Sequence, residues 1–233
     1  MGEAEDLRAF RDAWLEAQDG LTGRHYAEAL EAAGEIDMAL EVCERMWELG
    51  FPAGYTDAAW IEHDRGNVGR AVQLMIAAAE VLEGDEGAEA EGVAGHWRWE
   101  HWNDVSAETM LRAGMQAYPS ARADLAALLR VTGRPVEGLE VLRAGVEAGE
   151  VVCMLPLGNV LSEHGDLAAA EALYRRAVDL GDTYAAWNLA VVLAEQGRHA
   201  EADDWAWRAA ATGDEVAIQH LSGRVSRDPA SDD

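Results

Sequence analysis

The chain has 233 residues, of which 44 are acidic and 18 are basic, so its formal net charge at pH 7 is −26. A surplus of this size repels nucleic acid and anionic membranes over most of the surface. Every basic residue is an arginine, which excludes chemistry that needs a lysine nucleophile or a lysine Schiff base.

The first predicted element is a helix within residues 1–20. Its apolar residues Leu7, Phe10, Trp14 and Leu15 share one face of that helix. We expect it to cap an array of repeats, because the first unit of such an array otherwise exposes an apolar face. The acidic start does not fit a secretory signal peptide.

Two series of glycines divide the rest of the chain into helix hairpins. The glycines expected at the turns are Gly34, Gly66, Gly133, Gly165 and Gly197, and all steps between neighbours except the one from Gly66 to Gly133 are equal in length. A second series, Gly50, Gly149, Gly181 and Gly213, follows its turn glycines at a constant interval of half that step. Glycine suits both places because a left-handed residue at a helix end costs glycine least. We therefore expect hairpins at about 21–50, 53–82, 89–118, 119–149, 151–181 and 183–213.

The long step between Gly66 and Gly133 contains a degenerate hairpin. The sequence MLRAGMQAY at 110–118 matches VLRAGVEAG at 141–149, which places the missing turn at Trp102. The charged, glycine-rich segment 83–92 is expected to be a mobile loop. It either acts as a hinge between front repeats (21–82) and back repeats (93–213) or is a tolerated insertion without a role.

The last predicted helix lies within 214–227 and covers the other end of the array. Its covering side is expected to be Val216, Ile218, Leu221 and Val225, and a disordered acidic tail is expected at 228–233. Inside the hairpins, the fifth and twelfth positions after each turn glycine are mostly small, and the fourth and eighth positions before it are mostly apolar. These spacings predict one buried face per helix, with Glu62 as the exception.

The hairpin pattern resembles a known family. The order Leu189, Ala190, Leu193, Gly197, Ala202, Ala209 resembles the tetratricopeptide repeat, and the sequence WAWRAAATGDEVA at 205–217 is similar to its Sel1-like branch. The resemblance covers roughly 21–225, with a period slightly shorter than the usual one of about 34 residues. It implies an all-α fold, a right-handed α-solenoid of about six antiparallel helix hairpins with capping helices at both ends. It also implies a module that binds partner proteins and is not an enzyme.

The resemblance further implies where a partner binds, because the first helix of each tetratricopeptide hairpin lines a concave face. The residues that we expect to contact a partner there are Trp60, His63, His96, Trp99, Asn159, Tyr184, Trp187, Val191 and Glu195. The aromatic residues among them have an alternative role, packing against neighbouring hairpins. Arg24 and Arg130 are the only basic residues at lining positions, which argues against a clamp for a partner's C-terminal carboxylate.

No motif in the sequence indicates catalysis, a metal or a cofactor. In HWRWEHW at 96–102, a helical zinc pair would need two histidines four positions apart, and His96 and His101 are five apart. The chain has neither a phosphate-binding loop with lysine nor a GxSxG motif. Cys43 and Cys153 are expected to be buried, reduced thiols, as in a cytoplasmic protein.

Two hypotheses about function remain. The leading one is a cytoplasmic adaptor or scaffold that binds a peptide or helix of a partner protein in its groove, through apolar anchors and basic flanks on the partner. The alternative is an acidic inhibitor, immunity-type or DNA-mimic protein that blocks a basic surface. Binding of the second kind should weaken steeply as salt rises.

Overall fold

The computed structural model describes residues 2–225, and every regular element in that range is a helix. The tail expected at 228–233 lies outside the described residues. The chain divides into two compact units, Met1–Leu128 and Leu129–Asp233, called unit 1 and unit 2 below. None of the helices in the described range is long and apolar enough to cross a membrane.

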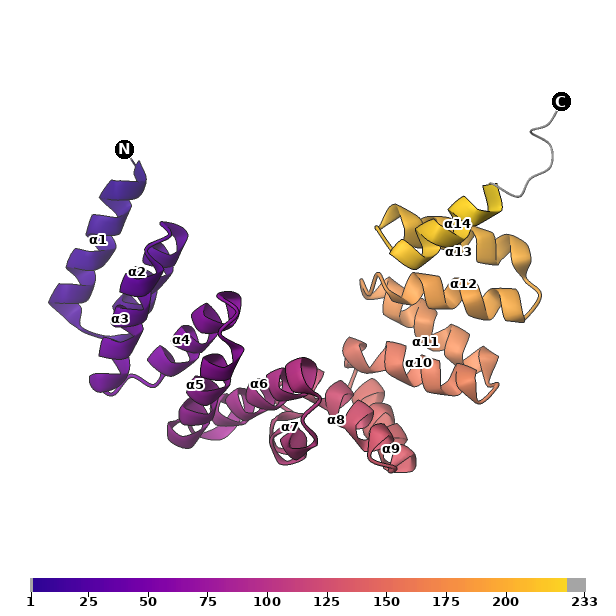
Figure 1. Cartoon of the computed structure of the whole chain (residues 1–233), viewed down its shortest axis with the longest axis horizontal. Helices are drawn as coiled ribbons and strands as arrows, with labels where there is room; N and C mark the ends of the chain where they lie inside the picture. Colours follow the sequence, from indigo (N-terminus) through magenta and orange to yellow (C-terminus); the bar gives the residue numbers. More distant parts are fainter. Residues whose placement is uncertain (1, 226–233) are drawn as a thin grey trace. The chain divides into compact units, whose positions relative to one another are not determined.

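Unit 1 is a series of helices in which each packs against the next from α1 to α7 (Figure 1). Its elements are α1 (Gly2–Ala17), α2 (Gly20–Ala32), α3 (Ile36–Glu48), α4 (Ala53–Asp64), α5 (Val68–Val81), α6 (Gly84–Trp102), η1 (Val105–Ala107), α7 (Glu108–Gly114) and most of α8 (Pro119–Val131). Helix α2 also contacts α4, so the first helices of successive hairpins are neighbours.

The glycines of both series adopt left-handed backbone conformations, for example φ +79° at Gly34 and +88° at Gly50. In the degenerate hairpin, Asn103 takes the place of the turn glycine and has φ 49°. Asparagine is among the few residues with a side chain that tolerate this conformation. The turn that the sequence predicts near Trp102 is therefore present without a glycine.

The core of unit 1 follows the predicted spacing. Leu30, Ala39, Met46 and Ala78 are fully buried in one cluster of side chains. Glu62 lies at the fourth position before its turn glycine, where the other glycine-marked hairpins have leucine, and it remains partly exposed. Its carboxylate accepts a hydrogen bond from the Asn67 side chain at 2.7 Å. A polar residue at this helix end thus bonds to the turn instead of entering the core.

The expectation of a mobile loop at 83–92 is wrong. Helix α6 begins at Gly84 and runs through this segment without a break to Trp102. Gly87 and Gly92 in this segment, and Gly95 just after it, are places of close packing. A Cβ atom added to Gly87 would lie 2.6 Å from the carbonyl oxygen of Leu82, and one added to Gly95 would lie 3.0 Å from the backbone nitrogen of Leu111.

Helices α6 and α7 approach most closely at a pair of glycines. A Cβ added to Gly114 would lie 2.1 Å from the Cα atom of Gly92 and 2.7 Å from the carbonyl oxygen of Ala88. Both neighbours are backbone atoms, which cannot rotate away. At this crossing the degenerate hairpin therefore has no room for a side chain larger than a hydrogen atom.

Unit 2 contains the other helix hairpins. Its elements are α9 (Pro135–Glu147), η2 (Val151–Cys153), α10 (Met154–Glu163), α11 (Leu167–Asp179), α12 (Ala185–Glu195), α13 (His199–Ala211) and α14 (Glu215–Val225), and each of these helices contacts the next (Figure 1). Met154, Leu189 and Leu193 are fully buried in its main cluster. Tyr174 also lies there, and its ring fills the space beside Gly158.

An ion-pair network ties two hairpins of unit 2 together. Glu171 on α11 accepts hydrogen bonds from Arg175 at 2.9 Å and from Arg198 at 2.7 Å, and Arg198 also pairs with Glu201 at 2.6 Å. Desolvation raises the pKa of Glu171, but the hydrogen bonds from Arg198, Arg175 and Gln196 outweigh it, so the pKa is lowered overall. The carboxylate therefore stays ionised between α11 and the start of α13.

The capping helices bury only part of the sets expected, which include Trp14 and Leu221. In α1, Trp14 is buried whereas Leu15 is 60% exposed. In α14, Ala217 and Leu221 are buried, whereas Val216 and Ile218 are exposed. A terminal helix packs against a neighbour on one side only. When its apolar residues extend beyond that contact, the large side chains at the edge remain exposed to solvent.

We predict that Gly114→Ala destabilises the protein by about 2 kcal/mol or more, because the added methyl group overlaps backbone atoms of α6. The free energy of unfolding from chemical denaturation measures this effect. Gly69→Ala on α5 is the matched control, since its Cβ would meet no atom within 4 Å. We expect that variant to be neutral or slightly more stable. Equal losses in both variants would contradict the close-crossing explanation.

Candidate functional site

Each unit has a cavity whose lining includes residues from the first helix of at least one hairpin. On these helices, the predicted lining positions include the thirteenth, tenth and sixth positions before the turn glycine. In unit 1, these positions on α4 are Ala53, Thr56 and Trp60, and all three line one cavity. In unit 2, Trp187 and Val191 on α12 line another.

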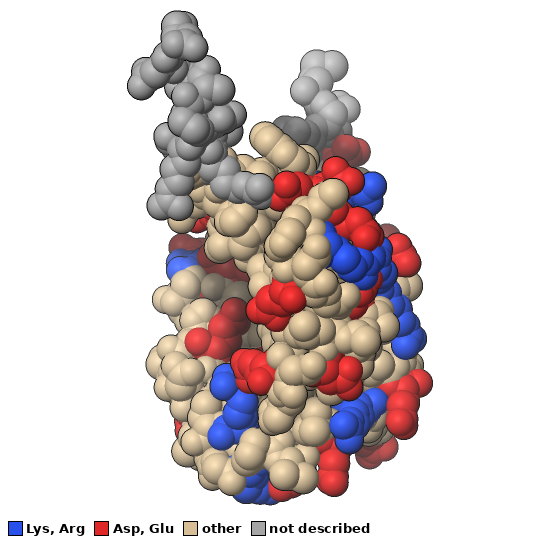
Figure 2. Space-filling view, turned by 90° about the vertical axis from the view of Figure 1, so that its right-hand side faces the viewer, with Lys and Arg blue, Asp and Glu red and all other residues tan. Residues whose placement is uncertain are grey.

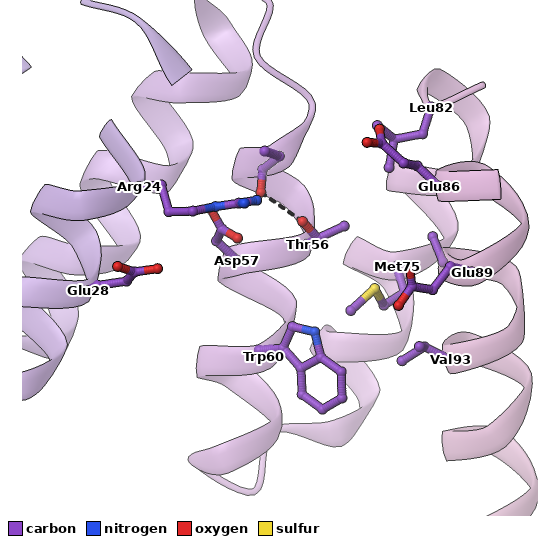
Figure 3. A pocket seen from close by; sticks show the side chains of 12 residues that line it. Arg24, Glu28, Thr56, Asp57, Trp60, Met75, Leu82, Glu86, Glu89 and Val93 are labelled. Carbon is purple, nitrogen blue, oxygen red and sulfur yellow. Dashed lines mark hydrogen bonds and ion pairs between the residues drawn. The ribbon is translucent and has the colours of Figure 1, made fainter. Parts of the chain in front are cut away.

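The unit-1 cavity has a volume of about 550 Å³ and lies between α2, α4 and α6, with α5 at its base. The side chains of Arg24, Glu28, Thr56, Asp57, Trp60, Met75, Leu82, Glu86, Glu89 and Val93 line it (Figure 3). Figure 3 shows the carboxylates of Glu28 and Asp57 on one side and those of Glu86 and Glu89 on the other, with Trp60 and Met75 between them. The cavity therefore combines acidic walls with an apolar base.

One ion pair lies within the wall of the unit-1 cavity. Arg24 Nε on α2 donates a hydrogen bond to Asp57 Oδ2 on α4 at 3.1 Å. Burial raises the pKa of Asp57, and the hydrogen bond and charge of Arg24 only partly offset that effect. Arg24 thus stabilises the charged form of Asp57, but not enough to cancel the effect of burial.

The unit-2 cavity, called the unit-2 groove below, has a volume of about 740 Å³ and lies between α12, α13 and α14. Its lining consists of Trp187, Ala190, Val191, Ala194, Glu195, His199, Ala202, Asp203, Ala206 and His220. Ala190, Ala202 and Ala206 are buried, so methyl groups form its base. Because these side chains are small, they leave space that the indole of Trp187 borders without filling.

The structure brings some of the predicted site residues together and leaves others apart. Trp187, Val191 and Glu195 share the unit-2 groove, and the Trp187 ring lies 5.2 Å from that of His220. Trp60 lies in the unit-1 cavity and is 45% exposed. Tyr184 is 73% exposed at the start of α12, outside the residues that line the groove.

His63 lies in an aromatic cluster beside the unit-1 cavity. Its ring stacks on that of Trp97 at 4.4 Å, and Trp97 is fully buried in the core. Trp60 and His101 contact the His63 ring edge-on at 6.0 and 5.6 Å. The cluster supports the alternative, packing role for His63, whose Nε2 atom is buried without a hydrogen-bond partner among the described residues.

The remaining predicted residues make contacts within the protein or lie outside both cavities. His96 Nδ1 on α6 is 2.6 Å from Asp124 Oδ2 on α8, and Trp99 is partly buried outside the lining residues. Asn159 on α10 accepts a hydrogen bond from the hydroxyl of Tyr174 at 2.8 Å. His96 and Trp99 are thus partly buried, whereas Asn159 is exposed but has its side-chain oxygen bonded to Tyr174.

Several cavity residues are absent from the set predicted from the sequence. The spacing already places Arg24 at a lining position, although it is not among the residues expected to contact a partner, and the same spacing places Glu28 at the sixth position before Gly34. His220 on α14 was missed because that helix was treated as a cap. Glu86 was missed because its segment was expected to be a loop.

The described residues include no group of three or more histidine, cysteine, aspartate or glutamate side chains placed to hold a metal ion. On the face shown in Figure 2, acidic and arginine side chains lie interspersed. Many arginines pair with carboxylates of the same chain, such as Arg65 with Asp37 and Arg134 with Glu137. The surplus carboxylates consequently determine the charge that a partner meets.

Sequence comparison identifies the repeats. Family models of the tetratricopeptide repeat match residues 119–144, 183–208 and 151–181. Over these residues the chain is similar to the tetratricopeptide repeat. The matches fall on the hairpins from α8 to α13, and the predicted resemblance to the tetratricopeptide and Sel1-like repeat family is confirmed. A search of curated proteins gives no match.

Solved tetratricopeptide and Sel1-like structures share the fold at low sequence identity. A chain in the structure of the Cut9–Hcn1 hetero-tetramer of the APC/C aligns over 95% of this chain and 46% of its own length, at TM-score 0.68 and 12% identity. This chain thus spans less than half of that protein's length. A Sel1 repeat protein from Oxalobacter formigenes aligns over 88% of this chain and 99% of its own, at TM-score 0.65 and 14% identity. The C-terminal part of a repeat protein from Cytophaga hutchinsonii aligns over 94% of both chains, at TM-score 0.58 and 13% identity. The predicted all-α solenoid class is confirmed.

We predict that the contact between His96 and Asp124 makes stability depend on pH. Burial lowers the pKa of His96, but the hydrogen bond and charge of Asp124, together with Glu100, outweigh burial and raise it overall from 6.5. Glu100 lies 3.4 Å from Nε2, and the ring of Tyr118 lies beside the imidazole. A raised folded-state pKa means that the stabilisation is fully present below pH 6.5 and is lost as pH rises through the raised value.

Asp124→Asn should therefore reduce the free energy of unfolding more at about pH 5.5 than at about pH 8.5. The difference between the two losses should be about 1 kcal/mol, since hydrogen bonds to charged groups are stronger than neutral ones. Chemical denaturation of both proteins at both pH values measures it. Equal losses at the two pH values would show that the histidine is not charged in this contact.

Proposed function

We propose that this tetratricopeptide-repeat chain is a non-catalytic binding module, an adaptor or scaffold, and that the unit-2 groove binds a segment of a partner protein. Tetratricopeptide-repeat proteins generally bind protein partners, and the further claim concerns which surface does so here. The observation that carries the proposal is the groove of about 740 Å³ that Trp187 borders on an alanine base.

The shape of the groove favours an apolar side chain as the anchor. Ala190 and Ala206 at the base are only 3% exposed, so they supply a methyl surface close to the helix backbones. Trp187 is packed against the α12–α13–α14 side chains on one side, which fixes the indole as a rigid wall. Apolar or aromatic residues that enter such fixed pockets dominate the binding energy of many interfaces.

The charges around the groove favour basic residues beside the anchor. Glu195 and Asp203 line the groove, and the chain as a whole carries a net charge of −26. Negative charge around an apolar site attracts a positively charged partner and raises its association rate. The partner that fits is therefore a helix or an extended segment with an apolar residue flanked by arginine or lysine.

We predict that peptides selected from a random display library on the whole protein carry an apolar residue with basic neighbours. Their affinity should fall at least tenfold on Trp187→Glu, because the new carboxylate meets the buried anchor. Trp207→Glu is the matched control, since Trp207 is a 59% exposed tryptophan on α13 outside the groove lining. Circular dichroism checks that both variants keep the helical content of the parent protein.

The same titrations distinguish the alternative function, a protein that blocks a basic surface by charge alone. Peptides that bind Trp187→Glu as well as the parent, and that dissociate as salt is raised, would contradict the groove and favour the acidic exterior. Peptides that lose affinity only on the groove variant and stay bound at high salt would support the groove.

A further inference from the structure

The unit-1 cavity has a chemistry unlike that of the unit-2 groove. Its lining includes four carboxylates and one cation, Arg24, so its formal charge is −3. The carboxylates come from three helices, with Glu28 on α2, Asp57 on α4, and Glu86 and Glu89 on α6. Between these acidic walls lie the apolar side chains of the base (Figure 3).

We propose that this cavity is a second binding site, which takes an arginine side chain of a partner protein. The aliphatic stem of the arginine packs on Trp60, Met75 and Val93, and its guanidinium lies against the carboxylates of Glu86 and Glu89. The inference rests on the proposed function only in taking the cation to belong to a protein segment, and it does not require the unit-2 groove.

The first support is that a guanidinium already lies in one wall of the cavity. Arg24 is bonded to Asp57, and that hydrogen bond raises the pKa of Arg24 although burial opposes it. The charges of Glu28 and Glu86 raise it further. The field inside the cavity therefore stabilises a cation, and Arg24 neutralises only one of the four carboxylates.

The second support is the fixed orientation of Trp60. Its indole is 45% exposed and meets the buried ring of Trp97 edge-on, at 4.9 Å and 85° between the planes. Because Trp97 is held in the core, the face of Trp60 is presented as a rigid surface. A guanidinium stacks favourably on such a face. Within unit 2, Arg208 makes this contact over Trp205 at 4.5 Å.

The third support is the match between the cavity and the two ends of an arginine side chain. Long basic side chains bury an aliphatic stem on apolar surface and keep the charged head among polar groups. The base of Met75 and Val93 suits the stem, and the carboxylates on either side suit the head. Arginine fits better than lysine because its planar head can both stack on Trp60 and pair with a carboxylate. A volume of about 550 Å³ also accommodates the neighbouring backbone of a segment.

The test titrates the full chain with two short peptides, acetyl-Gly-Ala-Arg-Ala-Gly-amide and the same peptide with citrulline in place of arginine. Citrulline has the shape of arginine without its charge. The readout is the indole N–H signal of Trp60 in NMR spectra, assigned from its loss in Trp60→Phe. We expect a saturable shift of that signal with the arginine peptide and none with the citrulline peptide. The signal of Trp102, an exposed tryptophan at the end of α6, should not shift with either peptide.

The carboxylates are tested by Glu86→Gln combined with Glu89→Gln, which should weaken binding of the arginine peptide at least tenfold. The matched control, Glu16→Gln combined with Glu80→Gln, removes the same charge from exposed positions outside the cavity and should leave affinity within twofold. Equal binding of the citrulline peptide, or unchanged affinity in the cavity variant, would overturn the inference.

Two further titrations separate this inference from its alternatives. Spermidine that binds the cavity more tightly than the arginine peptide would assign the site to a free polyamine and overturn the proposed source of the cation. Trp187→Glu should leave the Trp60 shift unchanged, so failure of the unit-2 groove does not affect this site. Conversely, library peptides that need Trp187, found together with no shift at Trp60, would overturn the arginine site alone.

Discussion

The close approach of paired helices is the constraint on which the rest of the protein depends. Each helix of a hairpin meets its partner at alanines or glycines, and the fully buried Ala39, Ala71 and Ala170 occupy equivalent positions in different hairpins. Small residues let the backbones approach, and they leave the larger side chains free to fill the space between hairpins. In the α6–α7 hairpin the helices meet at Gly92 and Gly114, where a Cβ on Gly114 would lie 2.1 Å from the Gly92 Cα atom. The unit-2 groove follows from the same constraint, since Ala190, Ala202 and Ala206 leave room beside the helices that they belong to.

The repeat could be predicted from the sequence because it depends on spacing, and spacing is visible without coordinates. The glycines of both series are at left-handed positions, and the predicted buried columns are mostly buried. The prediction failed where one residue type has two uses. Glycines in the charged segment 83–92 indicate a loop by composition, yet Gly87 and Gly92 lie inside α6, where neighbouring atoms leave no space for a side chain.

The candidate sites were harder to predict than the fold, for a different reason. The predicted lining positions before the turn glycines include Trp60, Trp187 and Val191, which do line the cavities, because those positions depend only on helix periodicity. The lining positions do not indicate which aromatic rings pack against other side chains of the same protein. His63 lies on the same kind of column and stacks on Trp97, and His96 pairs with Asp124 from a later helix. Such pairings depend on side-chain conformations and on long-range contacts that a periodic pattern does not contain.

The two cysteines give each compact unit its own reporter of local opening. Cys43 is fully buried in unit 1 and Cys153 is fully buried in unit 2. Burial, the largest effect, raises the pKa of the Cys43 thiol to about 12, so the thiolate that reacts with alkylating reagents is scarce in the folded state. Reaction at each position therefore requires that the surrounding hairpin open first. The rates of alkylation at Cys43 and Cys153, resolved by peptide mass, would compare how readily the hairpins around the two cysteines open in one unmodified chain.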